Sequence, residues 1–216
     1  MKKKLIIVGC GGHAKVALEC ALSTGQYQVV GFSDDFTKGS FKGYKILGSL
    51  ASVKNKYSDE SEIQFFIAVG ENHKREKIFN FFGGGISCAI LVHPTASVAA
   101  TTSIGEGTII MANAVIESDA AVGKFCILNT NSSLNHDCVM GDFASLAPGV
   151  NVGGNCMIGK SSAICIGASI SHGKIIGESS VIGGHSFVNS DIPEKKIAFG
   201  VPCKIKRARS KDESYL

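Results

Sequence analysis

The sequence lacks any apolar run that approaches the about 20 residues of a membrane-spanning helix. Its beginning, MKKKLIIVGCGGHAK, has basic then apolar residues as a signal peptide does, but the apolar run ends at Gly11, Gly12 and His13. That run is too short to insert into a bilayer. We therefore expect a cytoplasmic protein that does not insert into a membrane.

The sequence also lacks CxxC spacing and a concentration of charge of one sign. Its eight cysteines lie mainly among apolar or small residues, which predicts reduced thiols that pack in the interior. The net charge of +4 is spread thinly, and the only basic run is KIKRARSK, residues 204–211. Because no aromatic platform accompanies this run, we interpret it as a solvated tail and expect no nucleic-acid partner.

The second half of the chain has a repeat of six residues. Counted in sixes from Val98, the first residue of each of sixteen consecutive hexads is apolar, which chance does not explain. Two residues earlier the side chain is usually small, and residues two apart on a strand face the same side. The pattern predicts a parallel β-helix of about five coils, each built from three hexads. The apolar positions are Val98, Ile104, Ile110, Ile116, Val122, Leu128, Leu134, Met140, Leu146, Val152, Ile158, Ile164, Ile170, Ile176, Ile182 and Val188.

The first half of the chain alternates strand and helix patterns. The expected strands are LIIVG, QVVGF, EIQFFIAVG and CAILV, and the clearest helices follow the first strand and lie in NHKREKIFNFF. This alternation predicts a small Rossmann-like α/β domain with a parallel sheet. We place it at residues 1–93 and the β-helix with its C-terminal tail at residues 94–216, with VHPTASV at the seam.

A glycine-rich turn follows the first expected strand. Gly9, Gly11 and Ala14 fit G-x-G-x-x-A, and Asp34 lies about 20 residues further on, as in a dinucleotide fingerprint. A purely structural turn uses glycine in the same way, so both readings stay open. Since a domain of about 90 residues has room for little more than one mononucleotide half, a nucleotide-sugar fits better than NAD.

His136 and Asp137 stand out within the repeat. They occupy the third and fourth places of their hexad, away from the inward positions, and should project at a corner. A histidine with an adjacent carboxylate is suited to general-base catalysis, although a plain surface histidine is equally compatible with the pattern. His172 has the same place two coils away, about 10 Å along the axis, which is too far for two ligands of one zinc ion. We therefore expect no metal.

Several segments together resemble the PglD/NeuD-like family of sugar O- and N-acetyltransferases, which are hexapeptide-repeat acyltransferases. They are IVGCGGHAKV, GFSDD, IAVGENHKR, LVHPTASV, ILNTNSSLNHDCVMGDF and FGVPCK, and they extend over nearly the whole chain. The resemblance implies a left-handed β-helix and a homotrimer. It also implies that His136 is the catalytic base, that Asp137 supports its basicity and that Asn129 contacts the acceptor sugar.

The resemblance further assigns two sets of binding residues. Relatives commonly have a second histidine, which positions the acetyl carbonyl, where this chain has Ser145; a serine hydroxyl has a shorter reach. The nucleotide is expected at Gly11, Gly12, His13, Asp34, Asp35, Gly70 and Asn72. The coenzyme A arm is expected at Ser145, Gly154, Ile166 and Gly184.

These assignments imply acetyl-CoA-dependent N-acetylation of a nucleotide-linked 4-amino sugar, carried by UDP or GDP, for a surface glycan. A free amine attacks the thioester while His136 accepts a proton, without a covalent enzyme intermediate. Amides near Gly154 or the Ser145 hydroxyl would stabilise the oxyanion. O-acetylation of sialic acid or a related sugar, and a non-catalytic nucleotide-binding assembly module, are the alternatives.

Overall fold

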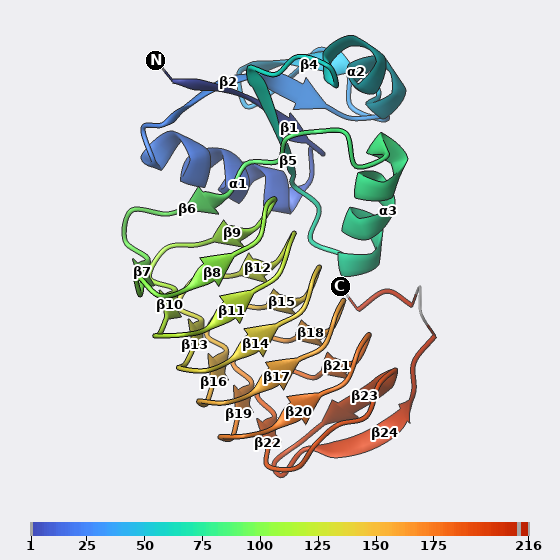
Figure 1. The fold of residues 1–216 in the computed structure, drawn as a ribbon. Helices are drawn as coiled ribbons and strands as arrows, with labels where there is room; N and C mark the ends of the chain where they lie inside the picture. The colour runs from blue at the N-terminus through green and yellow to red at the C-terminus, as the bar shows by residue number, and fades with distance from the viewer. Residues whose placement is uncertain (1, 211–212, 216) are drawn as a thin grey trace.

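The computed structural model describes residues 2–210 and 213–215 and has two parts joined end to end (Figure 1). The first part is a five-stranded sheet in the order β3-β4-β2-β1-β5, parallel except for the β3–β4 pair. Its elements are β1 (Lys3–Val8), α1 (Gly12–Ser23), β2 (Tyr27–Ser33), β3 (Ser40–Phe41), β4 (Tyr44–Gly48), α2 (Leu50–Tyr57), β5 (Ile63–Ile67) and α3 (Asn72–Phe82).

The second part is a parallel β-helix with three flanks, each a ladder of two-residue strands, and we call it the prism. The domain-side flank contains β6 (Leu91–Val92), β9 (Ile109–Ile110), β12 (Ile127–Leu128), β15 (Ser145–Leu146), β18 (Ala163–Ile164) and β21 (Val181–Ile182). The polar flank contains β7 (Ser97–Val98), β10 (Val115–Ile116), β13 (Ser133–Leu134), β16 (Asn151–Val152), β19 (Ser169–Ile170) and β22 (Phe187–Val188). The aliphatic flank contains β8 (Ser103–Ile104), β11 (Ala121–Val122), β14 (Val139–Met140), β17 (Met157–Ile158) and β20 (Ile175–Ile176).

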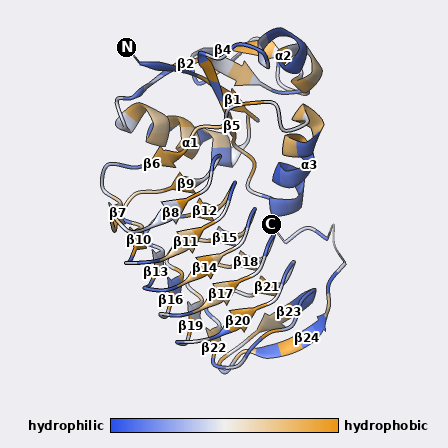
Figure 2. Ribbon diagram, viewed as in Figure 1, coloured by the Kyte–Doolittle hydropathy of each residue, from blue (hydrophilic) through white to orange (hydrophobic). Residues whose placement is uncertain are grey.

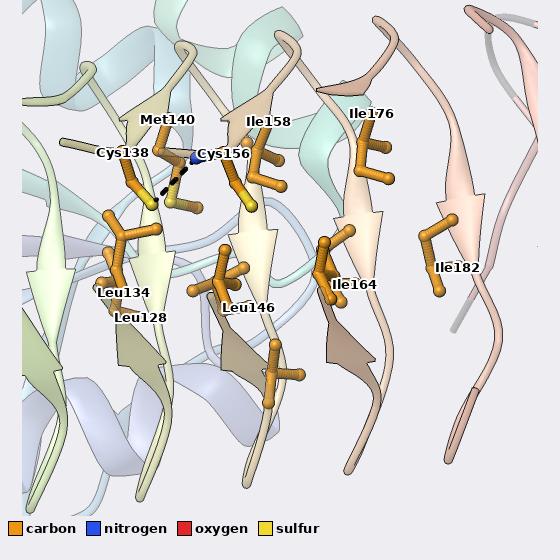
Figure 3. Packing of buried hydrophobic residues seen from close by; sticks show 14 of the residues in the cluster. Leu128, Leu134, Cys138, Met140, Leu146, Cys156, Ile158, Ile164, Ile176 and Ile182 are labelled. Atoms are coloured by element: carbon orange, nitrogen blue, oxygen red, sulfur yellow. Dashed lines mark hydrogen bonds between the residues drawn. The ribbon is translucent and has the colours of Figure 1, made fainter. Parts of the chain in front are cut away.

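The hexad prediction holds at every position. Each of the sixteen apolar residues is the second residue of its strand, from β7 to β22. Partners in adjacent coils are 18 residues apart, as in Leu128 with Leu146 and Leu146 with Ile164. Figure 3 shows several of these side chains, such as Leu146 and Ile164, stacked inside the prism beside Cys138 and Cys156. The small residues of the pattern lie in the same buried core, for example Ala144 and Ala168.

The end of the α/β domain differs from the expected strand CAILV. Cys88 forms an isolated bridge with Phe65 of the α/β sheet, whereas Leu91 and Val92 pair with Ile109 and Ile110 of the prism. Cys88 and Leu91 are both buried, but in different clusters: Cys88 packs with Phe65 and Phe82 of the α/β domain, whereas Leu91 packs where α1 meets Ile109 and Ile127 of the β-helix. The strand predicted as one unit is therefore the covalent and hydrogen-bonded link between the two parts.

The prism ends in an antiparallel pair, β23 (Lys196–Phe199) with β24 (Lys204–Ala208), and β23 continues the domain-side flank. The basic run predicted as a solvated tail instead forms β24, whose residues are exposed, and then continues to Arg209, which is buried, so the prediction of a solvated tail is wrong for that residue. Lys211 of that run lies outside the described residues. No helix of the described chain is both long and apolar enough to cross a membrane.

Helix α3 fixes the α/β domain on the prism. Phe79 packs on Phe125, which stacks on Phe143 with ring centroids 5.1 Å apart. Beside them, the buried guanidinium of Arg75 donates to the carbonyls of Phe125 and Phe143 at 2.8 and 3.0 Å. The amino-terminal half of α3 is hydrophilic (Figure 2), so this contact combines aromatic packing with buried polar contacts.

Candidate active site

His136 and Asp137 lie at the corner between the polar and the aliphatic flank. We call this corner (residues 117–120, 135–138, 153–156 and 171–174) the basic corner, after the predicted base His136 and not after its charge. The Nδ1 atom of His136 is 2.8 Å from Oδ2 of Asp137, and both side chains are exposed. Asp137 has a left-handed backbone with φ of 58°, held by a hydrogen bond from its amide to the Ser118 carbonyl. With Nδ1–H donated to the carboxylate, Nε2 is the atom left to accept a proton.

The His136 ring lies over Gly154, one coil further along the prism. A Cβ atom at position 154 would be 2.5 Å from Nε2 of His136, so only glycine leaves room for this ring position. The glycine also separates His136 from His172, and their ring centroids are 6.3 Å apart. The separation of about 10 Å that two coils predict is therefore wrong for the rings. Even so, no group of three or more potential metal ligands occurs within the described ranges.

A cavity of about 440 Å³ lies between α1 and the domain-side flank. It extends to the corner that follows this flank (residues 129–132, 147–150, 165–168 and 183–186), which we call the cavity corner. Six of the predicted site residues line it, together with Tyr215, which the sequence did not single out. The six are Gly12, His13, Gly70, Asn129, Ser145 and Ile166.

His13 faces this cavity from the first turn of α1. Its Nε2 atom is buried and has no hydrogen-bond partner among the described residues. Burial, together with the positive charge of Arg75, lowers the pKa of His13 to about 4. The imidazole is therefore neutral at physiological pH, and its unpaired nitrogen is available to a polar group of a ligand.

Asp34 and Asp35 lie in a second cavity of about 340 Å³, at the carboxyl ends of β1 and β2. Asp34 accepts backbone hydrogen bonds from Cys10, Phe36 and Thr37 at 2.7–3.0 Å. Burial raises the pKa of Asp34, but the hydrogen bonds from Thr37, Phe36 and Cys10 outweigh it and hold the pKa below its ordinary value. Asp35 accepts from the amide of Leu50 at the start of α2. Both carboxylates thus shape the loops of this cavity.

The glycine-rich turn connects the two cavities. Gly9 has φ of 104°, and a Cβ atom there would lie 3.2 Å from the carbonyl oxygen of Ala68, so glycine is required. Gly11 and Gly12 are exposed at the amino end of α1. Free amides at a helix start favour an anionic group such as a phosphate. The turn therefore suits a diphosphate between the cavity that holds Asp34 and the one that holds Ser145.

The other predicted residues are distributed unevenly. Gly184 lies at the cavity corner, where a Cβ atom would be 3.3 Å from the carbonyl oxygen of Ile166. Gly154 lies at the basic corner with His136. Asn72 lines neither cavity, because its side-chain amide donates to Ser161 and Ser162 and accepts from Arg75. The structure thus separates His136, predicted as the base, from the cavity that six of the predicted binding residues line.

Sequence reasoning missed three residues around the cavity. Arg75 donates to the carbonyls of Val69 and Gly70 as well as to the prism. Glu71 is buried and accepts hydrogen bonds from Ser214 and from the Tyr215 amide. Tyr215 reaches the cavity from the end of the chain. Of these three residues, only Arg75 could have been suspected from the sequence, because it is a charged residue in a helix that must pack against another part of the fold.

Comparisons with known proteins agree with this architecture. A family model described as the PglD N-terminal domain matches residues 4–82. The UDP-N-acetylbacillosamine N-acetyltransferase of Bacillus subtilis (strain 168) is 36% identical over 113 residues, which are 51% of this chain and 52% of that protein. The chain thus aligns with about half the length of this curated relative. An uncharacterised mimivirus protein, L142, is 32% identical over 116 residues, which are 22% of its length.

Solved structures match over nearly the whole chain. The acetyltransferase domain of PglB from Neisseria gonorrhoeae FA1090 has a TM-score of 0.90 at 31% identity, covering 95% of this chain and 100% of that one. PerB from Caulobacter crescentus, in complex with CoA and GDP-perosamine, has a TM-score of 0.86 at 30% identity, covering 94% and 97%. The predicted fold class, an α/β domain followed by a left-handed β-helix, is confirmed. The chain belongs to the PglD/NeuD-like family of hexapeptide-repeat sugar acetyltransferases.

Proposed function

We propose that the protein transfers the acetyl group of acetyl-CoA to the amino group of a nucleotide-linked 4-amino sugar in surface glycan synthesis. The observation that carries this proposal is the cavity in which His13, Asn129, Ser145 and Ile166 meet. Its relatives support the substrate class, since PerB is in complex with CoA and GDP-perosamine and the PglB domain has been solved with acetyl coenzyme A. Residues 1–93 would bind the nucleotide-sugar, and residues 94–216 would bind the acetyl donor.

The proposed chemistry uses His136 as general base. Asp137 accepts a hydrogen bond from Nδ1–H and orients the ring, so Nε2 takes a proton from the free amine as it attacks. The amine adds to the thioester carbonyl, a C–N bond forms, and collapse of the tetrahedral intermediate breaks the C–S bond. Coenzyme A leaves as the thiol after accepting a proton, which the His136 imidazolium can supply. Asp137 stabilises that imidazolium by its charge.

The division of the site between two corners supports a shared active site. His136 projects from the basic corner, whereas Asn129 and Ile166 lie at the cavity corner. Next to the basic corner, the aliphatic flank exposes Val139, Met157 and Ile175 by 46%, 52% and 47% of their surface. A continuous apolar column of this kind is typical of a subunit interface. We therefore propose a homotrimer in which His136 of one copy serves the cavity of a neighbour.

We propose that the reaction takes place in the cytoplasm, which its proposed donor and its thiols support. Acetyl-CoA is a cytoplasmic metabolite, and all eight cysteines are free. The proposed catalytic step routes nothing through a metal. The cavity at Asp34 and Asp35 would bind the nucleoside end of the acceptor.

The first test is release of free thiol from acetyl-CoA with a panel of UDP-, GDP- and CMP-linked amino sugars and free sialic acid. We expect release with one 4-amino sugar, and a loss of about 100-fold or more in kcat for His136→Ala. The matched control is His93→Ala, a hydrogen-bonded histidine at the seam, which should keep full activity. Release with sialic acid alone would instead assign O-acetylation, and full activity of His136→Ala would contradict the proposed base.

The second test addresses the shared site. His136→Ala and Asn129→Ala chains carrying different tags are co-expressed, and mixed assemblies are isolated by both tags. If neighbours share the site, mixed assemblies contain some sites with an intact His136 and an intact Asn129, so part of the activity returns. Mixed assemblies as inactive as each parent, or a stable monomer in sedimentation, would contradict sharing.

A further inference from the structure

The last described residues of the chain lie against the proposed active site. After β24, the Arg209 guanidinium donates to the Ser179 carbonyl at 2.9 Å and lies over the Tyr215 ring, 5.3 Å from its centroid. Ser214 and the amide of Tyr215 bond to Glu71 at the start of α3. The tail is therefore anchored at both the prism and the α/β domain, and it holds the Tyr215 side chain in the cavity wall.

The Tyr215 hydroxyl contacts three groups from different segments. It accepts a hydrogen bond from the Asn72 amide at 3.1 Å and lies 3.3 Å from the Gly70 carbonyl. On its other side it is 3.5 Å from Oγ of Ser145, at the long end of the hydrogen-bond range. Ser145 is itself almost completely buried and lines the same cavity. The two hydroxyls therefore form a polar pair in a wall made largely of aliphatic residues.

The protons of this pair have two arrangements. In the first, the phenol donates to Ser145, and the serine hydroxyl donates into the cavity; in the second, the phenol donates to Gly70, and Ser145 donates to the phenol. A ligand oxygen in the cavity selects the first arrangement, because the serine proton then has an acceptor there. Burial raises the pKa of Tyr215 against the opposing effects of Ser145 and Arg75, so the phenol keeps its proton and remains a donor.

We propose that Tyr215 is a positioning residue that orients the Ser145 hydroxyl to donate a hydrogen bond to the carbonyl oxygen of the acetyl thioester. This inference rests on the proposed acetyl transfer. The chain of donors runs from the Asn72 amide through Tyr215 and Ser145 to the thioester. Serine has a shorter reach than histidine, and this chain of hydrogen bonds offsets that disadvantage. Because Tyr215 holds the Ser145 hydroxyl in place, the hydroxyl loses less conformational entropy when it binds a ligand atom.

The experiment compares Tyr215→Phe, Ser145→Ala and the double variant by thiol release. Phenylalanine keeps the ring over Arg209 and removes only the hydroxyl. We expect Tyr215→Phe to lower kcat/KM for acetyl-CoA about fivefold, the effect of one neutral hydrogen bond, with the KM for the nucleotide-sugar unchanged. In the Ser145→Ala background the same change should have no further effect, because Tyr215 acts through that hydroxyl. Independent losses that multiply in the double variant would overturn the proposal.

Tyr27→Phe is the matched control. It removes another buried phenol hydroxyl, which donates to the Ile90 carbonyl at 3.1 Å away from the cavity. Both tyrosine variants should melt at similar temperatures, and only Tyr215→Phe should lose activity. Equal kcat/KM values for acetyl-CoA in the two variants would overturn the positioning role.

A binding measurement separates this inference from the proposed function. We expect the wild type to bind acetyl-CoA more tightly than CoA, and Tyr215→Phe to reduce that ratio by up to about fivefold, because only acetyl-CoA has the thioester carbonyl. A ratio near one in the wild type, or an equal loss for both ligands in the variant, would overturn the inference. Failure of every acceptor to release thiol would count against the proposed function, and the affinity ratio would still decide the role of Tyr215.

Discussion

The two parts of the molecule turn their main chain in different ways. In the α/β domain, positive φ angles occur at glycines such as Gly9 and Gly48, and among its other residues only at Lys42 within the described chain. In the prism, corner after corner uses a residue with a side chain in the left-handed conformation, including Asp137 at 58° and Phe143 at 59°. The repeat therefore offers many turns that can carry functional groups, whereas the α/β domain places them after strand ends.

The difference has a physical cause. A left-handed residue other than glycine costs about 1 kcal/mol, and a single loop has little to offset that cost. At the prism corners each such residue donates its amide to the coil below, as Phe143 does to Lys124 at 2.8 Å and Asn155 to His136 at 2.8 Å. Stacking in register thus supports turns that an isolated loop would leave to glycine.

Breaking the contact between the two parts should have the largest effect. Arg75→Met leaves buried carbonyls of Phe125, Phe143 and Val69 without their donor, and we expect a loss of about 3–5 kcal/mol in the free energy of unfolding. Urea unfolding measures the loss, and separate transitions for the two parts would accompany it. Arg207→Met, which removes only an exposed ion pair, should leave the midpoint unchanged. Equal midpoints for both variants would refute the role of Arg75.

A change of pH should weaken the α/β side selectively. The pKa of His13 is about 4 in the folded chain and near 6.5 when unfolded, so its contribution to stability is complete above pH 6.5 and declines as the pH falls towards 4. The shift corresponds to at most about 3 kcal/mol. Thermal unfolding between pH 8 and 4 should show a smaller decline for His13→Gln than for the wild type. Parallel curves would contradict the buried, neutral imidazole.

Adding one methyl group at each of two prism glycines should separate an effect on activity from an effect on stability. In Gly154→Ala the new Cβ displaces the exposed His136 ring, so we expect activity to fall about 10- to 100-fold with little change in unfolding. In Gly141→Ala the Cβ meets the backbone nitrogen of Lys160 at 2.7 Å, and stability should fall by about 1–3 kcal/mol. Thiol release and thermal unfolding of both variants test this pair. Full activity of Gly154→Ala would mean that the ring position is unimportant.

The smallest effect is expected at an exposed contact between the same two parts. Lys160 of the prism lies 2.6 Å from Glu76 of α3, with its side chain 44% exposed. Lys160→Met should cost about 0.5 kcal/mol at low salt and less in 0.5 M NaCl, because solvent and ions screen such pairs. Urea unfolding at two salt concentrations provides the measurement. A cost similar to that of Arg75→Met would contradict the distinction between buried and exposed contacts.

The prism could be predicted almost residue by residue, because its contacts repeat every 18 residues and leave a period in the sequence. The strand ends at Ile110, Leu146 and Ile182 all follow from that period. The α/β domain has no such period, and its strands β3 and β4 were not expected. The order of strands and helices still sufficed for its class.

Contacts between distant segments could not be predicted, since no local pattern encodes them. The split of CAILV between two cores, the burial of Arg75 and the return of Tyr215 to Gly70 depend on how the two parts meet. The rings of His136 and His172 approach because Gly154 has no side chain, which strand spacing alone does not reveal. The roles of the site residues remain predictions for the experiments above.

Because residues 18 apart are paired, equivalent positions recur at regular intervals along the axis of the prism. His136, Gly154 and His172 hold equivalent places in successive coils, so moving a base from one to the next shifts it by about 4.8 Å without turning it. The α/β domain lies at one end of the prism. Exchanging the residues at 136 and 154 would therefore move the imidazole by about 4.8 Å along the axis while the fold stays the same.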